Sequence, residues 1–459
     1  MTAPTRDFEA PAVTFDRRLY PPMVLGSILN PVNSSMMAVA LVPIGVAFGA
    51  PATQTAWLVS ALYLATSIGQ PVTGRLVDIF GPRRVFLIGA AFTAAAGLIG
   101  ALAPSLAALV VSRVLLGFGT CAGYPSAMNL IRREARRTGR ESPAGPLAVL
   151  TVANQTIAVL GPTLGGVLLA WGGWRVVFSV NLPLALACAV LSWLFLPRDE
   201  PAEPGDGRRR LDLDLTGMGL FAATLVAALV FLMDLADPVW WQLLVAIAAG
   251  AGFWLWEWRR AAPFIDVRVL VGNRALLATY LRTFLSAVTA YMFLYGVTGW
   301  LQSGYGLTPV QAGLLLLPTF LAAVAVTALT GRREQVRGKL VVSAVCQLAA
   351  AGLLLVVDPS SPVWLLGLVA GLVGIPQGLA NLANQNALYR QAVPERIASS
   401  AGLLRTFMYL GAIAAASVNG LALTHGGLHE LAAAMAVAAA GFLVLVVADR
   451  SLAQPGGRP

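Results

Sequence analysis

Polar side chains interrupt the long apolar runs of this sequence, and several of them recur at helical spacing. Asn30, Asn33 and Ser34 share one stripe of the first apolar run. A second stripe, in a run nearer the C-terminus, comprises Gln377, Asn381, Asn384 and Gln385. Amides and hydroxyls can line a path for a polar ligand, and they also hydrogen-bond one helix to another. Both interpretations stay open from the sequence.

Three arginines also lie inside apolar runs: Arg113, Arg282 and Arg405. An unpaired cation is costly in apolar surroundings, so it normally faces a cavity or a partner and marks function. Acids lie only near the ends of these runs, so an anionic or strongly hydrogen-bonding ligand could neutralise the arginines. The alternatives are hydrogen bonds from Arg113 to helix carbonyl groups, and extension of Arg282 and Arg405 toward the nearby ends of their runs.

The sequence offers little for covalent or metal chemistry. Its three Cys fall singly inside apolar runs, and it holds only two His. It contains no cluster with metal-ligand spacing, no nucleophile beside a base, and no glycine loop with the Lys that a nucleotide-driven pump needs. We therefore expect no enzyme, no catalytic residue, no metal and no cofactor.

Composition predicts the elements that must position these side chains. Of 459 residues, 58% are hydrophobic and 11% are charged, whereas an ordinary soluble domain carries about 25% charged residues. A helix that spans a membrane needs about 20 mainly apolar residues. The sequence therefore predicts an all-α polytopic membrane protein.

Apolar runs of spanning length occur at fourteen places along the chain. They lie near 22–48, 54–75, 85–103, 106–130, 146–170, 175–196, 214–234, 238–257, 276–301, 309–331, 339–357, 362–385, 398–422 and 428–448. Because fourteen is even, both termini are predicted to lie on the same side of the membrane.

The distribution of Arg predicts which side that is. Alternate loops hold nearly all the Arg of the chain, and the opposite set of loops holds only Arg175. Lys and Arg accumulate in cytoplasmic loops, so both termini are predicted to be cytoplasmic. Topology thus accounts for the net charge of +10, and no nucleic-acid partner is needed to explain it. The Ala-, Gly- and Arg-rich composition favours a bacterial plasma membrane.

The runs group into six, two and six around two charged connectors. The predicted segments are a cytoplasmic tail (1–21), an N-terminal six-helix bundle (22–196), a charged linker (197–213), an extra central helix pair (214–257), a connector (258–275), a C-terminal six-helix bundle (276–448) and a second tail (449–459). Secondary transporters are commonly built from repeated bundles around a site near the middle of the membrane.

The loop after the second run, GRLVDIFGPRR, resembles the signature loop of the major facilitator superfamily. The residues that carry the resemblance, and that it implies as a conformational gating motif, are Gly74, Asp78, Gly81, Arg83 and Arg84. Glycine lets a short loop turn, and an acid at a helix end can pair with Arg. Arg113 with Gly117 and Gly119 resembles the second motif of the same family.

The fifth run holds GPTLGG, which resembles the motif of the antiporter branches of this superfamily. Its residues are Gly161, Pro162, Gly165 and Gly166. Gly161 and Gly165 leave one helix face bare, so a neighbouring helix can pack closely. The segments WRVVFSVNLP, PFIDVR and GYGLTPVQAG are similar to the fourteen-span drug:proton antiporter branch, and the extra central pair distinguishes that branch from its twelve-span relatives.

The resemblance implies a secondary transporter that works by alternating access between two six-helix bundles and exports small amphipathic compounds with an ion gradient. Asn33 stands where many members of the branch carry an Asp, so protons are only a candidate coupling ion. Candidate residues for the cavity or for coupling are Asn30, Asn33, Ser34, Arg113, Asn381, Asn384, Gln385 and Arg405. The expected partners are a small-molecule substrate and the lipid bilayer, without an obligatory protein partner. Import, anion exchange and lipid flipping by the same fold are alternatives, and a membrane-bound sensor or enzyme is a remote one.

Overall fold

The computed structural model describes residues 15–138, 144–199, 214–233, 239–260, 263–265, 267–330, 335–392, 397–425 and 427–453. Within these ranges the chain forms helices and no strand. Most of the predicted linker (197–213) and most of each predicted tail lie outside the described residues. The prediction of an all-α membrane protein is confirmed.

The first half of the chain forms eight α-helices. They are α1 (Tyr20–Phe48), α2 (Ala52–Phe80), α3 (Pro82–Ala101), α4 (Leu106–Thr120), α5 (Gly123–Thr138), α6 (Ala144–Gly172), α7 (Trp174–Ser179) and α8 (Asn181–Phe195). Two of the predicted runs are each divided between two helices, α4 with α5 and α7 with α8. Within 22–196 these helices form six successive stretches, and five of them are long and apolar enough to cross a membrane.

The second half begins with a pair of helices, α9 (Leu215–Met233) and α10 (Trp240–Arg259), and continues with a second set. That set consists of α11 (Val267–Gly272), α12 (Arg274–Tyr291), α13 (Thr298–Ser303), α14 (Pro309–Leu315), α15 (Leu317–Thr330), α16 (Val336–Leu354), α17 (Val363–Gln391), α18 (Ile397–His425) and α19 (Gly427–Ala448). A six-residue π-helical stretch, η2 (Met292–Val297), joins α12 to α13.

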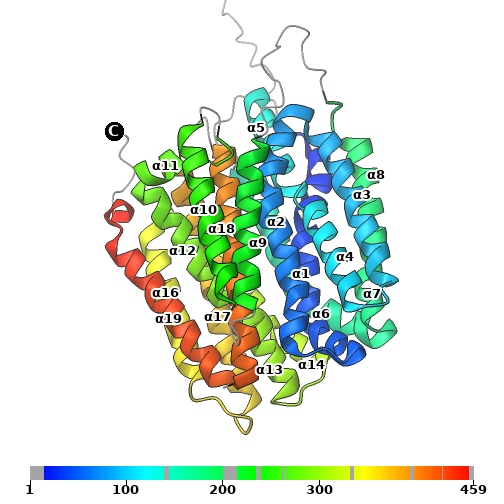
Figure 1. Cartoon of the computed structure of the whole chain (residues 1–459), viewed down its shortest axis with the longest axis vertical. Coiled ribbons are helices and arrows are strands. Elements are labelled where there is room, and N and C mark those ends of the chain that lie inside the picture. The colour runs from blue at the N-terminus through cyan, green and yellow to red at the C-terminus, as the bar shows by residue number, and fades with distance from the viewer. Residues whose placement is uncertain are drawn as a thin grey trace, which may run out of the picture.

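Eleven of the described stretches are long and apolar enough to cross a membrane, and α9 supplies a shorter apolar one. Two more helices, α2 and α10, run beside them (Figure 1). The predicted count of fourteen spans stays a prediction, because α2, α9 and α10 do not meet the same measure of length and hydropathy.

The helices form two bundles that lie side by side. Figure 1 shows α1 to α8 on one side and α12 with α16 to α19 on the other, while α9 and α10 lie in front of the junction. The contacts agree, because α9 packs on both α2 and α18. The ends of α5 and α11 lie at one end of the molecule, and α13 and α14 lie at the other. Following the orientation that the Arg distribution predicts, we call these the cytoplasmic and the extracellular end.

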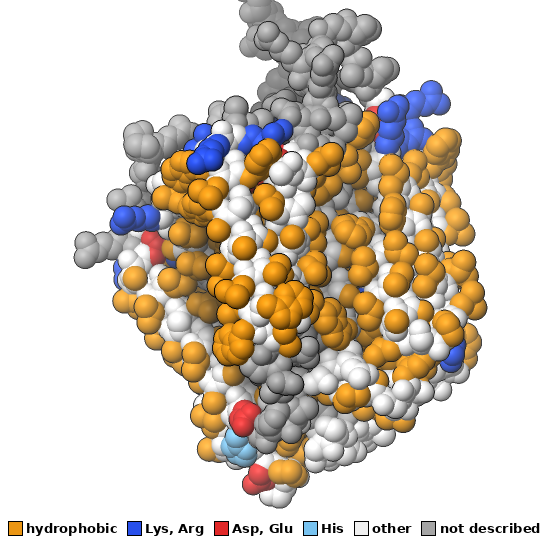
Figure 2. Space-filling model, in the orientation of Figure 1, with side chains coloured by type: hydrophobic (Ala, Val, Ile, Leu, Met, Phe, Trp, Pro, Cys, Tyr) orange, Lys and Arg blue, Asp and Glu red, His pale blue; other side chains and the backbone are white. Residues whose placement is uncertain are grey.

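The surface of the molecule matches a position in a bilayer. Figure 2 shows apolar side chains over the middle of the visible face, with Lys and Arg gathered at the cytoplasmic end. Exposed apolar side chains such as Val437, Trp364 and Leu329 would be unfavourable in water, and lipid covers them in a membrane.

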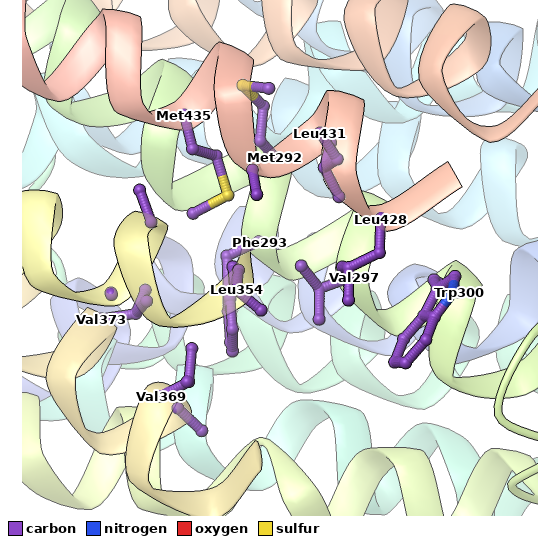
Figure 3. Packing of buried hydrophobic residues seen from close by; sticks show 14 of the residues in the cluster. Met292, Phe293, Val297, Trp300, Leu354, Val369, Val373, Leu428, Leu431 and Met435 are labelled. Carbon is purple, nitrogen blue, oxygen red and sulfur yellow. The ribbon is translucent and has the colours of Figure 1, made fainter. Parts of the chain in front are cut away.

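The C-terminal bundle has its own apolar core toward the extracellular end. Figure 3 shows Met292, Phe293 and Val297 of η2 facing side chains of α16, α17 and α19. Leu354 and Met435 are fully buried there. This close packing fixes the π-helical stretch, and the stretch in turn positions Tyr295 toward the other bundle.

Candidate functional site

A cavity of about 200 Å³ lies between the two bundles. From the first bundle it is lined by Asn30, Pro31, Ser34, Ser35, Tyr124, Leu150, Thr151, Asn154 and Gln155. From the second bundle it is lined by Thr283, Ser286, Ala287, Ala290, Tyr291, Leu294, Phe320, Pro376, Gln377, Asn381, Asn384, Gln385, Arg405, Met408 and Tyr409. Most of these residues lie in the middle or the cytoplasmic half of their helices. The cavity therefore belongs to the cytoplasmic side of the molecule.

The wall of the cavity is rich in amides and poor in charge. Seven lining side chains are Asn or Gln, and no Asp or Glu is among the described residues on the wall. Arg405 is the one lining residue with a full charge. Apolar side chains such as Leu294, Phe320 and Met408 make up the rest of the wall, so the cavity offers both hydrogen bonds and apolar contact.

Arg405 reaches across from the C-terminal bundle to the N-terminal one. Its guanidinium lies 4.2 Å from the centre of the Tyr124 ring, in a cation–π contact between α18 and α5. The residue is half-buried. It thus presents a positive charge to the cavity and also touches both bundles.

The residues of the predicted stripe on α1 lie in two different places, the cavity wall and the interior of the first bundle. Asn30 and Ser34 line the cavity, and the amide nitrogen of Asn30 donates to the Thr120 hydroxyl at 3.1 Å. Asn33 lies on another face of α1, where it exchanges two amide hydrogen bonds with Asn181 of α8, at 2.6 and 2.9 Å. Asn33 is therefore placed inside the first bundle and not on the cavity wall.

The predicted stripe on α17 lies along the cavity as a whole. Asn381, Asn384 and Gln385 all line it, and Gln385 donates to the side-chain oxygen of Asn381 at 3.0 Å. Gln155 of α6 donates to the backbone carbonyl of Gln377 at 3.5 Å, which joins the two bundles across the cavity. The polar residues of α6 and α17 thus form opposite walls.

The other two arginines within spans have protein partners. Arg113 is 1% exposed, and its Nε donates to the Leu58 carbonyl oxygen at 2.9 Å. Arg282 is fully buried and forms an ion pair with Asp449 at 2.5 Å. Neither residue lines the cavity. Arg113 therefore bonds a helix carbonyl group, as one sequence interpretation allowed.

Tyrosines close the extracellular side of the cavity. The Tyr63 hydroxyl of α2 lies 2.9 Å from the Tyr295 hydroxyl of η2, and Tyr295 donates to the Ser34 carbonyl at 3.0 Å. The rings of Tyr291 and Tyr409 pack against Tyr63 with centroids 5.1 and 5.4 Å away. This cluster belongs to both bundles.

The predicted antiporter-like motif lies at two helix contacts. A Cβ on Gly165 would lie 2.9 Å from the Met36 Cα, so this glycine lets α6 pack directly on α1. A Cβ on Gly166 would lie 3.0 Å from the Val310 Cα, and one on Gly313 would lie 2.9 Å from the Pro162 carbonyl oxygen. Gly161 packs on Ser35. The motif therefore brings α6 against α1 within one bundle and against α14 of the other.

The predicted signature loop is held by Asp199, four residues beyond the end of α8. The carboxylate of Asp199 accepts hydrogen bonds from the backbone N–H groups of Arg83 and Arg84, at 3.2 and 2.9 Å, and so caps α3. Gly81 has a φ of +86°, and a Cβ there would lie 2.7 Å from the Cβ of Asp199. A Cβ on Gly74 would meet no atom within 4 Å. The side chain of Asp78 lies outside the described part.

This architecture of two bundles around a cavity is matched by a family model. The model described as the Major Facilitator Superfamily covers residues 23–416. The chain belongs to the major facilitator superfamily. The predicted membership is thereby confirmed, and a multi-pass position in a cell membrane follows from the family and the described spans.

Relatives within the superfamily include transporters with drug-resistance names. An uncharacterised transporter of this superfamily, YwoD of Bacillus subtilis (strain 168), is 33% identical over 86% of this chain and 88% of its own length. The tetracenomycin C resistance and export protein of Streptomyces glaucescens is 28% identical over 87% of this chain and 74% of its own length. A multidrug resistance protein B homolog of Mycobacterium tuberculosis (strain ATCC 25618 / H37Rv) is 28% identical over 89% and 76%. The resemblance to the multidrug efflux branch is confirmed by these relatives.

Solved structures of the superfamily share the fold. The nucleoside transporter NupG matches with a TM-score of 0.61 at 13% identity, over 95% of this chain and 99% of its own. The human organic anion transporter MFSD10 matches with a TM-score of 0.64 at 17% identity, over 94% and 99%. At these identities the likeness concerns the major facilitator fold and not the substrate.

Sequence reasoning missed several residues of the cavity wall in this major facilitator chain. Tyr124, Asn154, Gln155 and Tyr409 were not predicted to belong to it, although the cavity is lined by all four. Asn154 and Gln155 are amides inside an apolar run, which is the same signal that the α1 and α17 stripes give. Tyr124 and Tyr409 carry no comparable signal, because aromatic residues are common in spans.

Proposed function

We propose that this transporter exports small amphipathic compounds by alternating access, with the cavity between its bundles as the substrate site. The observation that supports the proposal is a cavity lined by both bundles on the cytoplasmic side while tyrosines and glycines close the extracellular side. An exporter must load its substrate from the cytoplasm or the inner leaflet in this conformation. The resistance and export names of the relatives are consistent with that direction.

The predicted segments take roles within this proposal. The N-terminal bundle (22–196) and the C-terminal bundle (276–448) rock against each other, while the central pair (214–257) covers their junction. The signature loop, with Gly74, Asp78, Gly81, Arg83 and Arg84, gates the cytoplasmic side. The α6 motif, with Gly161, Pro162, Gly165 and Gly166, is the contact that opens and closes on the extracellular side.

An ion gradient drives the step in this proposal, and the coupling residue lies away from the cavity wall. No acid occurs among the described residues that line the cavity, so substrate and proton do not share a carboxylate there. Exchange of anions is the second candidate function, because it needs no such carboxylate. Proton movement that accompanies transport separates the two.

The test is accumulation of fluorescent dyes and antibiotics in a bacterium that lacks its own efflux pumps and expresses this chain. Export lowers accumulation, and collapse of the proton gradient by an uncoupler restores it. Ser286→Trp places a large ring in the cavity and should abolish the effect, whereas Val437→Trp, on the lipid-facing side of α19, should not. Raised accumulation that depends on the intact cavity would overturn export in favour of import.

A further inference from the structure

We infer that the transport cavity selects amphipathic organic anions and that Arg405 binds their charged group. This inference rests on the proposed function, because it names the substrate class of the same cavity. Two observations support it: the charges on the cavity wall, and the accessibility of the three arginines within the spans.

Arg405 is the one of these arginines that a ligand can reach. Arg113 is 1% exposed and Arg282 is 0% exposed, and both lie off the cavity wall. Arg282 is also neutralised by Asp449. Arg405 is half-buried and lines the cavity. A substrate that enters between the bundles therefore meets the charge of Arg405.

The protein itself supplies no carboxylate to Arg405 in the part of the chain that the structure describes. Its guanidinium lies 4.2 Å from the centre of the Tyr124 ring and is hydrogen-bonded to the hydroxyls of Tyr124 and of Tyr409, which lies one helical turn further along α18. A guanidinium carries five N–H donors, so these two tyrosine hydroxyls leave donors for a ligand. A carboxylate, phenolate or sulfonate of the substrate would accept from those donors in a charge-assisted pair.

The rest of the cavity wall also favours amphipathic organic anions as substrates. Amides such as Asn381, Gln385 and Asn154 accommodate the oxygen atoms of the substrate, and Leu294, Phe320 and Met408 contact an apolar body. A cationic substrate would meet Arg405 without a compensating acid, and like charges at close range disfavour binding. The cavity thus discriminates by attraction of anions and by repulsion of cations.

The experiment measures binding to the purified transporter in nanodiscs by fluorescence polarisation, with two dyes of one skeleton and opposite charge. Fluorescein is an anion near neutral pH, and tetramethylrhodamine methyl ester is a cation on the same xanthene frame. We expect the natural protein to bind fluorescein about tenfold more tightly or better, as one charged hydrogen-bonded contact allows. Arg405→Gln should lose that preference, and Arg405→Lys should retain part of it because the charge remains.

Arg175→Gln is the matched control, because it removes the same charge from an exposed position at the extracellular end. It should leave both affinities within about twofold. Equal binding of the two dyes by the natural protein, tighter binding of the cation, or an equal loss of both in Arg405→Gln with an unchanged melting temperature would each overturn the anion assignment. If Arg405→Gln has a lowered melting temperature, the anion assignment is tested by comparing Arg405→Lys with the natural protein. Loss of the preference for fluorescein in Arg405→Lys would then overturn the assignment. Failure of the dye-export assay in cells would instead overturn the proposed function.

Discussion

The hydroxyl groups of Tyr63 and Tyr295 lie 2.9 Å apart, and this contact joins α2 of one bundle to η2 of the other. Tyr295 donates in turn to the Ser34 carbonyl oxygen at 3.0 Å, so Tyr63 is the donor of the hydroxyl pair. The chain of hydrogen bonds runs from α2 through η2 to α1. It therefore connects the two bundles in this conformation, in which the extracellular side is closed.

Tyr295→Phe should shift the transporter toward an extracellular-open conformation. The change removes two hydrogen bonds of about 1 kcal/mol each, so the balance between the two conformations moves by roughly fivefold to thirtyfold. Spin labels at Trp171→Cys and Ser303→Cys, in a background without the three natural Cys, would report a longer distance between the bundles. Tyr305→Phe is the control, because its hydroxyl donates to the Ser361 carbonyl within one bundle. Identical distance distributions for the two variants would refute the role of Tyr295.

Gly313→Ala should separate the same two bundles by a steric route. A Cβ at this position would lie 2.9 Å from the carbonyl oxygen of Pro162, and backbone atoms of α6 cannot move aside without moving the helix. We expect a longer distance between the labels and a transport rate several-fold lower. Gly352→Ala is the matched control on α16, since a Cβ there meets no atom within 4 Å. Normal transport by Gly313→Ala would show that the closed contact is dispensable.

The ion pair between Arg282 and Asp449 should be a major source of stability in the C-terminal bundle. Arg282 is fully buried, so Asp449→Asn leaves a buried cation without its counter-ion, which costs about 3–5 kcal/mol. We expect a clearly lower melting temperature in detergent. The double variant Arg282→Leu with Asp449→Leu removes both charges and should recover much of the loss. Arg137→Gln, which breaks a more exposed pair with Glu134, should change melting far less. Additive losses in the double variant would contradict this explanation.

The sequence predicted the fold well because membrane spans are long and composition dominates them. Apolar runs of about 20 residues determine helices with little help from tertiary contacts. The divided spans were not predicted, since α14 ends and α15 begins within a continuous apolar run. Such an interruption depends on packing against α6, which lies far away in the sequence.

The site was predicted less completely, because a stripe of polar residues does not say which neighbour it faces. The sequence treated Asn30, Asn33 and Ser34 alike, yet only Asn30 and Ser34 line the cavity. The sequence left a structural role open for all three arginines, yet Arg113 bonds to Leu58 while Arg405 faces the cavity. In each case the partner comes from a distant part of the chain, so no local pattern could reveal it.

Variants of the hydrogen-bonded pair of Asn33 and Asn181 test whether Asn33, which stands where many members of the branch carry an Asp, serves structure or transport. Each side chain donates its amide to the oxygen of the other, at 2.6 and 2.9 Å, and both are buried. Asn33→Leu or Asn181→Leu leaves one buried amide without its partner, which costs about 1–3 kcal/mol. The double variant removes both amides, so its loss of stability should be well below the sum of the single losses.

Transport by the double variant of Asn33 and Asn181 then separates the two roles. If the amides only join α1 to α8, the double variant should recover both its melting temperature and most of its transport rate. If Asn33 takes part in ion coupling, a stable double variant should bind substrate normally and yet fail to concentrate it against a gradient. The first result is expected, because Asn33 is 3% exposed and lies off the cavity wall. A coupling ion would have to displace Asn181 to reach it.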